Sequence, residues 1–354
     1  MALAHQAAGS QKVSPMPAPK KTWFGVLASG QFRYVAIWVA LVVLLGVGAV
    51  FLPRSVQLGT LLAVLPFAAF LAMAAMGQAI VIMGRGIDLS VPAIMTLSST
   101  TLLAVSGGHD EQMIPAVLAA VAAALVVGAI NGVLVAVFRL NSLIVTLAVG
   151  SIVTGLTLWY RQSLPAEATV PPALADLGGS RFLELNSSVW LAAVLVVGLT
   201  VLLRKTIGGR RFEAVGANPV SANAIGLPVA LYQWLSFVGA SFLYAMAGLA
   251  LSAFIRNPTL DVGAPYLLAP IAAAVLGATA VSGGLGSMVS VTGAAIFLTQ
   301  LGQMLKLVGL ETSFQMIIQG VAIALGMWLS LSSSRVAPAH CAVRCRPAAS
   351  GRAR

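Results

Sequence analysis

Long apolar runs alternate with short polar breaks along most of the chain. A helix needs about 20 apolar residues to cross the hydrocarbon core of a bilayer, and many of the runs reach or approach that length. The pattern predicts ten membrane-spanning helices, over residues 34–52, 58–83, 91–106, 113–138, 142–160, 189–203, 230–254, 265–281, 288–305 and 314–331. The third is short for a span, and the longest polar loop, 161–187, follows the fifth. The expected fold is an all-α polytopic membrane protein.

A polar stretch at residues 208–228 interrupts the apolar second half of the chain. Asn218 is suited to be a helix N-cap, Pro219 to be the first helical residue, and Gly226 to end the helix before Pro228. These signals predict a helix of about two turns. Because so short a helix is marginal in water, we expect it to rest on another surface.

The composition agrees with a membrane protein and excludes a soluble one. Hydrophobic residues make up 59% of the 354 residues and charged residues only 8%, against about 25% charged in an ordinary soluble domain. Outer-membrane barrels show alternating apolar and polar residues, whereas these runs are continuous, so the spans are helices. The net charge of +11 is scattered between apolar runs, which argues against nucleic-acid binding.

The positions of Lys and Arg predict the orientation, because short cytoplasmic loops carry the excess of positive charge. Placing both termini in the cytoplasm leaves only Arg54, Arg161, Arg181, Arg256 and Lys306 on the outer side. We expect a disordered cytoplasmic tail at 1–33, a transmembrane domain at 34–331 with a cytoplasmic loop at 204–229, and a basic cytoplasmic tail at 332–354. The amino terminus lacks the features of a signal peptide.

The break Gly84-Arg-Gly-Ile-Asp-Leu-Ser-Val-Pro92 separates the second and third predicted helices. Ionisable residues at membrane depth are candidates for function, which makes Asp88 and its neighbour Ser90 candidates for a translocation path. The alternative is an interfacial turn in which Asp88 or Ser90 caps the third helix. The two interpretations are compatible, since a broken helix can line a cavity.

A second glycine-rich break, residues 282–287, precedes the ninth helix. It lacks the GK[ST] ending of a phosphate loop, and its loose similarity to the first break hints at an internal repeat. Asn131, Asn141 and Thr146 are polar residues of the fourth and fifth helices. They either line a translocation path or hydrogen-bond between helices.

Small residues recur in the later helices and predict close helix packing; they include Gly239, Ala240, Ser241, Ala245, Ala247, Gly248, Gly277, Ala278, Gly293, Ala294 and Ala295. No catalytic triad or paired carboxylates appear in the sequence. Cys341 and Cys345, near His340, do not have the spacing of a four-ligand metal site. We therefore expect neither catalysis nor a metal.

Four sequence blocks resemble, in order and spacing, the permease subunits of ribose-type ATP-binding cassette (ABC) importers, within the branched-chain amino acid and sugar permease superfamily. They are GRGIDLSVPAIMTLS, NGVLVAVFRLNSLIVTLAVGSIVTGLT, GRRFEAVGANPVSANAIGLPV and AAAVLGATAVSGGLGS. The likeness extends from about residue 58 to residue 331. Pro92 stands where the family commonly has glycine, and the last twenty or so residues match no part of it.

The resemblance implies a permease in the bacterial cytoplasmic membrane that moves a monosaccharide, such as a ribose-like pentose, inward. Its implied partners are a cytoplasmic ATPase, an external sugar-binding protein, a second permease copy and the surrounding lipid. ATP would bind to the ATPase, so the permease itself needs no cofactor and is not an enzyme. The loop at 204–229 would carry the ATPase-coupling helix, whose matching residues are Glu213, Gly216, Asn218, Pro219, Ala222 and Gly226.

Other functions remain open at this stage. A branched-chain amino acid permease belongs to the same superfamily. An ion-coupled secondary transporter would also use broken helices, but Asp88 is the one credible coupling carboxylate. A membrane anchor or receptor module is a further alternative, weakened by the lack of a soluble domain. The sequence does not identify the substrate.

Overall fold

The computed structural model describes residues 30–163, 169–310, 313–314, 316–318 and 320–321. Its longer elements are α2 (Gly30–Phe51), α3 (Leu58–Met83), α4 (Val91–Ser106), α5 (Met113–Gly132), α6 (Ser142–Arg161), α8 (Ser187–Lys205), α9 (Ile207–Ala217), α11 (Val229–Ile255) and α13 (Met288–Leu307). Its shorter elements are η1 (Pro53–Val56), η2 (Asp110–Gln112), the π-helical η3 (Val133–Val137), α7 (Pro172–Gly179), β1 (Arg181–Phe182), β2 (Leu185–Asn186), α10 (Pro219–Ala224), η4 (Ala264–Tyr266) and α12 (Ala269–Leu276). Most of both predicted tails and of the tenth predicted helix, with Cys341 and Cys345, lies outside the described residues.

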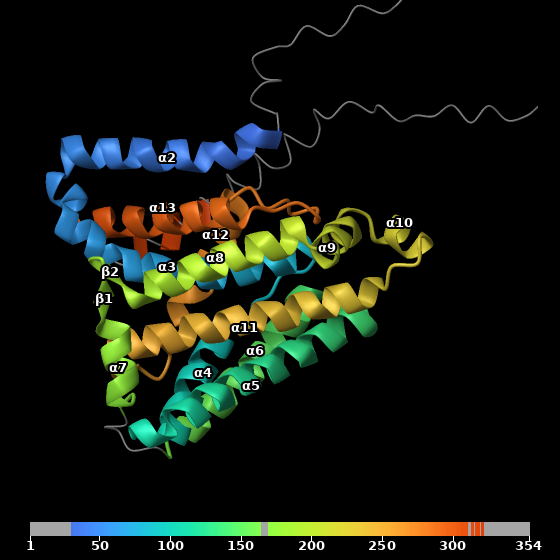
Figure 1. Ribbon diagram of the computed structural model, residues 1–354, viewed down its shortest axis with the longest axis horizontal. Helices are drawn as coiled ribbons and strands as arrows, with labels where there is room; N and C mark the ends of the chain where they lie inside the picture. The colour runs from blue at the N-terminus through green and yellow to red at the C-terminus, as the bar shows by residue number, and fades with distance from the viewer. Residues whose placement is uncertain (1–29, 164–168, 311–312, 315, 319, 322–354) are drawn as a thin grey trace, which may run out of the picture.

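The helix α3 forms the centre of the bundle and packs against α11, α13, α12 and α8 (Figure 1). It is apolar on every side, as a helix surrounded by protein must be, and from Ala68 to Met83 every residue is buried. The largest buried side chains in it are Phe70, Met73 and Met76. The second predicted helix is therefore confirmed at both ends and is the core of the fold.

Close crossings between helices depend on glycine. A Cβ atom at Gly77 of α3 would lie 2.5 Å from the ring of Tyr244 on α11, and one at Gly128 of α5 would overlap the Ser241 hydroxyl. Helices in lipid associate through such close contact, so the predicted packing role of small residues is confirmed at many positions. It is wrong at Gly239, where an added Cβ would have no neighbour within 4 Å among the described residues.

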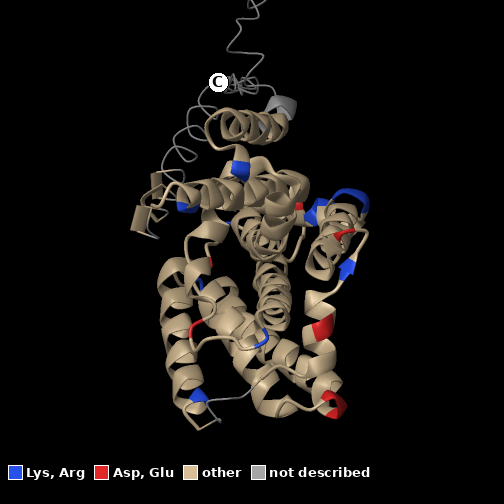
Figure 2. Cartoon of the chain, turned by 90° about the vertical axis from the view of Figure 1, so that its left-hand side faces the viewer, with Lys and Arg blue, Asp and Glu red and all other residues tan. Residues whose placement is uncertain are grey.

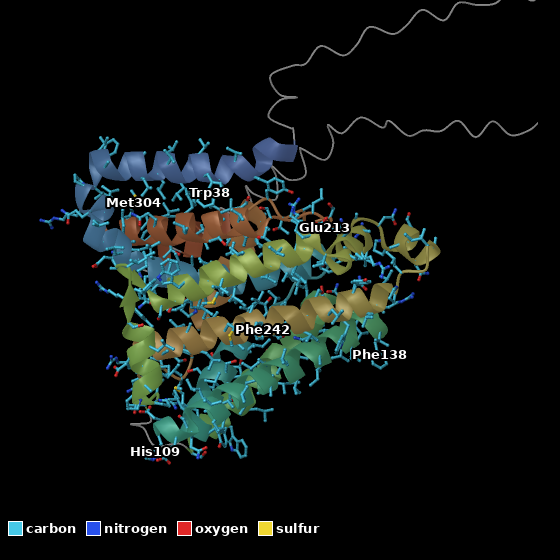
Figure 3. All side chains as sticks on the ribbon, viewed as in Figure 1. Trp38, His109, Phe138, Glu213, Phe242 and Met304 are labelled. Carbon is cyan, nitrogen blue, oxygen red and sulfur yellow. The ribbon has the colours of Figure 1, made fainter. Side chains whose placement is uncertain are left out.

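Two groups of helices flank α3. On one side α2 lies along the edge of the bundle and packs on α13, where Trp38 approaches Gly293 (Figures 1 and 3). On the other side α11 packs on α5, and α4 packs between α5 and α6. The described part of the long polar loop contains α7 and a β-hairpin with a two-residue turn, in which Leu183 and Glu184 have positive φ as a type I′ turn requires.

Seven helices within the described residues are long and apolar enough to cross a membrane. The third predicted span is confirmed as short, at 16 residues. The eighth, expected over 265–281, is wrong as a continuous helix, because only Ala269–Leu276 is α-helical beside the turn η4. Gly277 ends it, and the following residue, Ala278, has a φ of 63°.

The ends of α3 and α12 have the same geometry. After α3, Gly84 ends the helix, Arg85 has a φ of 69°, and the next amide returns to the helix as Gly86 N donates to the Val81 oxygen. After α12, Thr279 N donates to the Ala274 oxygen in the same way. The matching geometry lies at residues 277–279, ahead of the predicted break 282–287, so it is a similarity of the two helix ends.

Within the described residues, the loops after α5 and α8 lie at one end of the bundle and the loop after α4 at the other (Figure 1). Phe138 and Glu213 lie at one end and His109 at the other (Figure 3). At the His109 end, Arg256 pairs with Asp176 and Asp110 accepts a bond from Ala173 N. Viewed from that end, charged residues are few among the helices (Figure 2), as expected for a bundle surrounded by lipid.

Candidate functional site

The polar stretch after α8 folds as two short helices, where the sequence predicted one. The first, α9, begins after Thr206, whose hydroxyl accepts a bond from Gly209 N at 3.0 Å. It buries Phe212 and Val215 and exposes Arg210 and Arg211. Two consecutive glycines weaken the helical signal at its start, which explains why it was not predicted.

The second, α10, is the helix that the sequence predicted. Asn218 accepts a bond from Ser221 N at 3.1 Å, and Pro219 is the first helical residue. Gly226 has a φ of 81°, and the following Leu227 N donates to the Ala222 oxygen. These are the bonds of a Schellman ending. The predicted cap, start and stop are all confirmed.

Three segments distant in sequence meet where α9 ends. We call this contact the glycine junction; it consists of Arg85, Gly216, Ala217, Gly283 and Gly284. A Cβ at Gly216 would overlap the Met83 oxygen and lie 2.7 Å from Gly284 N. Gly284 N itself donates to the Met83 oxygen at 2.9 Å. The end of α9 is therefore packed directly on both helix breaks.

Arg85 provides the polar contacts of the glycine junction. Its Nε donates to the Gly216 oxygen at 2.7 Å and its Nη2 to the Ala217 oxygen at 2.6 Å. These carbonyls are at the carboxyl end of α9, where a cation is favourable. Nearby, Arg204 donates to the Gly286 oxygen at 3.1 Å and lies 3.9 Å from Glu213. The end of α8 thus contacts the second break as well, and Arg204 lies beside α9 through Glu213.

The break after α3 is held from inside the bundle by buried polar side chains. One oxygen of Asp88 accepts bonds from the amide and hydroxyl of Ser90, at 2.8 and 2.5 Å. Asn131 on α5 donates to the Ser90 hydroxyl at 2.9 Å. All three residues are fully buried. The second Asp88 oxygen and the Asn131 oxygen have no partner among the described residues.

Two further elements fix the same break. The Thr146 hydroxyl on α6 accepts a bond from Leu89 N at 2.9 Å, and the Ser142 hydroxyl accepts one from Ile87 N at 3.2 Å. Gln78 of α3, in the amide orientation that satisfies both its ends, bonds the backbone of Asp88 and the Tyr244 hydroxyl. The loop is extended and has few bonds to itself, so side chains supply the partners that its backbone needs inside a membrane protein.

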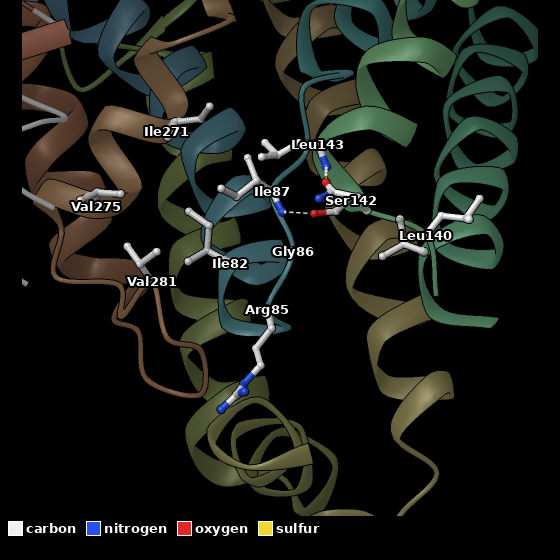
Figure 4. A pocket seen from close by; sticks show the side chains of 12 residues that line it. Ile82, Arg85, Gly86, Ile87, Leu140, Ser142, Leu143, Ile271, Val275 and Val281 are labelled. Carbon is white, nitrogen blue, oxygen red and sulfur yellow. Dashed lines mark hydrogen bonds between the residues drawn. The ribbon is translucent and has the colours of Figure 1, made fainter. Parts of the chain in front are cut away.

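A cavity of about 400 Å³ lies beside this break (Figure 4). Its lining combines apolar side chains with a few polar groups and comes from the break, from the start of α6 and from α12: Ile82, Arg85, Gly86, Ile87, Val135, Leu140, Asn141, Ser142, Leu143, Ile271, Val275 and Val281. Arg85 extends from the cavity toward α9 (Figure 4). The cavity and the glycine junction therefore share Arg85.

The predicted path residues occupy different places around the cavity. Asn141 lines it and also caps α6 by accepting a bond from Leu143 N. Asp88, Ser90, Asn131 and Thr146 are buried and do not line it, but their hydrogen bonds hold the break that does. Asn131 makes the cross-helix bond that was one of its two predicted roles.

Sequence reasoning missed Arg85 and the pair Gly283 and Gly284 as site residues. By sequence, Arg85 is a charge on a short loop, and the two glycines belong to a break that lacks the ending of a phosphate loop. The signal that could have found them is the similarity of the two breaks, because both follow an apolar helix and contain adjacent or alternate glycines.

Comparison with known proteins places the chain in a family. Residues 60–326 match the family model described as branched-chain amino acid transport system, permease component. The chain belongs to this permease family. It is accordingly a multi-pass integral membrane protein, with seven apolar helices of spanning length among the described residues.

Several known permeases are similar to this chain over most of its length. The ribose import permease protein RbsC of Escherichia coli K12 is 29% identical over 84% of this chain and 96% of its own. That of Bacillus subtilis is 30% identical, over 73% and 81%. The L-arabinose ABC transporter permease protein AraH of Azospirillum brasilense is 31% identical, over 68% and 70%. No solved structure matches the chain.

Proposed function

We propose that this permease is the membrane-spanning subunit of an ABC importer that moves a monosaccharide inward across the bacterial cytoplasmic membrane. A ribose-like pentose is the expected cargo. The observation that carries the proposal is the likeness to ribose and arabinose permeases over most of both chains. The proposed permease domain is 34–331, with the coupling loop at 204–229.

The cavity suits a small polar cargo. Binding pockets for small molecules have volumes of about 300–1,000 Å³ and combine apolar walls with a few polar groups. The cavity beside the break has about 400 Å³, and Asn141 and Ser142 contribute polar groups to it. We place the translocation path here, with Asp88, Ser90, Asn131 and Thr146 supporting its wall.

The two short helices are the proposed contact with the ATPase. The end of the bundle that carries them also carries Arg85, Arg204, Arg210 and Arg211, which favours the cytoplasmic side. Val220 and Ile225 on and beside α10 are 80% and 75% exposed. Exposed apolar groups on a cytoplasmic loop suit a protein partner better than water. Glu213, Gly216, Asn218, Pro219, Ala222 and Gly226 are the proposed coupling residues.

The complete importer would include further subunits. A separate cytoplasmic ATPase would bind and hydrolyse ATP, an external sugar-binding protein would deliver the cargo, and a second permease copy would complete the path. In this scheme, closure of the ATPase pushes on α10 and α9. The push reaches the two breaks through the glycine junction, because α9 packs on both of them.

A branched-chain amino acid is the second candidate cargo, favoured by the description of the family model. The two are separated by uptake into proteoliposomes that contain the permease with its ATPase and binding protein. We expect ATP-dependent accumulation of labelled ribose, little accumulation of labelled leucine, and no effect of a protonophore. Accumulation of leucine alone would replace the sugar assignment. Uptake that stops with a protonophore while ATP is constant would refute an ABC importer.

A further inference from the structure

Arg85 is placed to connect the coupling helices with the walls of the cavity. It lines the cavity, and its guanidinium holds the last two carbonyls of α9. We propose that Arg85 is the positioning residue through which movement of α9 reaches the translocation path. This inference rests on the proposed function and names one residue that makes the coupling work.

The backbone at Arg85 supports a special role. Its φ of 69° lies in the left-handed region, which is unfavourable for residues other than glycine. Gly84 and Gly86 flank it and could have taken that conformation more easily. The conformation directs the arginine side chain out of the break and toward α9 (Figure 4). An unfavourable backbone retained beside a cavity is typical of a functional position.

The partners of Arg85 are carbonyl oxygens and not carboxylates. Within the described part of the chain the ion pairs are Arg204 with Glu213 and Arg256 with Asp176. Charge-assisted hydrogen bonds are stronger than neutral ones, and Arg85 makes two to adjacent carbonyls. Its planar fork fixes the direction of the α9 end relative to the break, which a single point charge does not do.

The second break surrounds the same side chain. A Cβ at Gly283 would lie 2.6 Å from Arg85 Cγ and 2.6 Å from the Gly216 oxygen. Arg85 is exposed, but its stem lies between the end of α9 and the loop that follows α12. Residues of α12 and of the first break line the same cavity, as Val275 and Ile87 do. A shift of α9 must therefore either break the two Arg85 bonds or move the first break and α12, which line the cavity, together with α9.

The test compares the sugar transported with the ATP consumed. The full permease, its ATPase and its binding protein are reconstituted, and ribose uptake and ATP hydrolysis are measured in the same vesicles. The variants are Arg85→Lys, which retains the charge without the fork, and Arg85→Gln. The matched control is Arg139→Gln. Like Arg85, Arg139 is an exposed arginine at positive φ after a helix end, but its side chain makes no hydrogen bond or ion pair within the described residues.

Coupling between sites typically corresponds to about 5- to 150-fold. We expect ribose uptake per ATP to fall by about tenfold or more in Arg85→Gln and by less in Arg85→Lys, while the ATPase still co-purifies and hydrolyses ATP. The control should match the wild type. An unchanged ratio in both Arg85 variants would overturn the inference, as would an equal fall in the control. If neither Arg85 variant protein could be recovered from the membrane, Arg85 would be required for folding, and the inference would also be overturned.

Failure of the proposed function gives a different result. If the wild-type assembly takes up no ribose with ATP, the sugar-import assignment fails. If the wild type imports ribose and the Arg85 variants keep its ratio of uptake to hydrolysis, only the role of Arg85 fails.

Discussion

Adding one methyl group at Gly216 should uncouple transport from ATP hydrolysis. In Gly216→Ala, the new Cβ would overlap the Met83 oxygen and lie 2.7 Å from Gly284 N and 2.9 Å from Gly284 Cα. Ordinary van der Waals contact begins at 3.4 Å. All three atoms belong to the backbone, so no side-chain rotation can relieve the overlap, and α9 must move away from both breaks.

The size of the effect follows from what that movement breaks. Forcing an extra carbon into a packed site costs about 1–3 kcal/mol. Moving α9 also stretches the two Arg85 bonds to its carbonyls, which add less because Arg85 is exposed to solvent and exposed charged contacts contribute only about 0–1 kcal/mol. Because about 1.4 kcal/mol corresponds to a factor of ten, we expect uptake to fall by about tenfold or more.

The assay is ribose uptake by reconstituted vesicles, with ATP hydrolysis and the amount of inserted permease measured in parallel. The control is Gly198→Ala in α8, where an added Cβ has nothing within 4 Å. It should transport like the wild type. Normal uptake per ATP in Gly216→Ala would refute the glycine junction as the route of coupling. Loss of the inserted protein would show instead that the contact is required for folding.

Three smaller perturbations test other parts of the structure. Asn218→Ala should destabilise α10 by about 1 kcal/mol through loss of its cap, and it should lower ribose uptake at raised temperature. Asn218→Asp keeps a capping oxygen and should retain uptake. Equal uptake by the two variants would contradict the capping role. Asn131→Leu should cost about 1–3 kcal/mol, because it leaves the buried Ser90 hydroxyl without the Asn131 donor; an unchanged melting temperature in detergent would contradict this. Asp176→Asn should change stability by less than about 1 kcal/mol, since both side chains of its pair with Arg256 are more than half exposed. A large fall in melting temperature would be inconsistent with that exposure.

The sequence predicted the features that depend on neighbouring residues. The apolar runs identified α3, α4, α6, α8, α11 and α13 within a few residues of their bounds, because spanning helices satisfy their backbone bonds internally and only their length and polarity matter. The cap at Asn218 and the stop at Gly226 were also predictable, since their hydrogen bonds join residues of one turn.

Apolarity alone misjudged the eighth helix. Residues 265–281 are apolar and rich in alanine, as a spanning helix would be. The helix nevertheless ends at Leu276, and Gly277 packs against Val291 of α13 with no room for a Cβ. Hydropathy measures the cost of leaving water and not the direction of the backbone, so it does not distinguish a long helix from a short helix and a buried loop.

The candidate site was decided by tertiary structure. Arg85 and the carbonyls it binds are 131 and 132 residues apart, and Asn131 and Ser90 are 41 apart. Local patterns carry no information about such partners, because the same arginine only marks the topology if no other segment contacts it and joins two segments if another helix end reaches it. The sequence by itself determined a helical membrane permease with a short capped helix on one side. Only the packing of α9 on both helix breaks decided how that short helix is joined to the cavity.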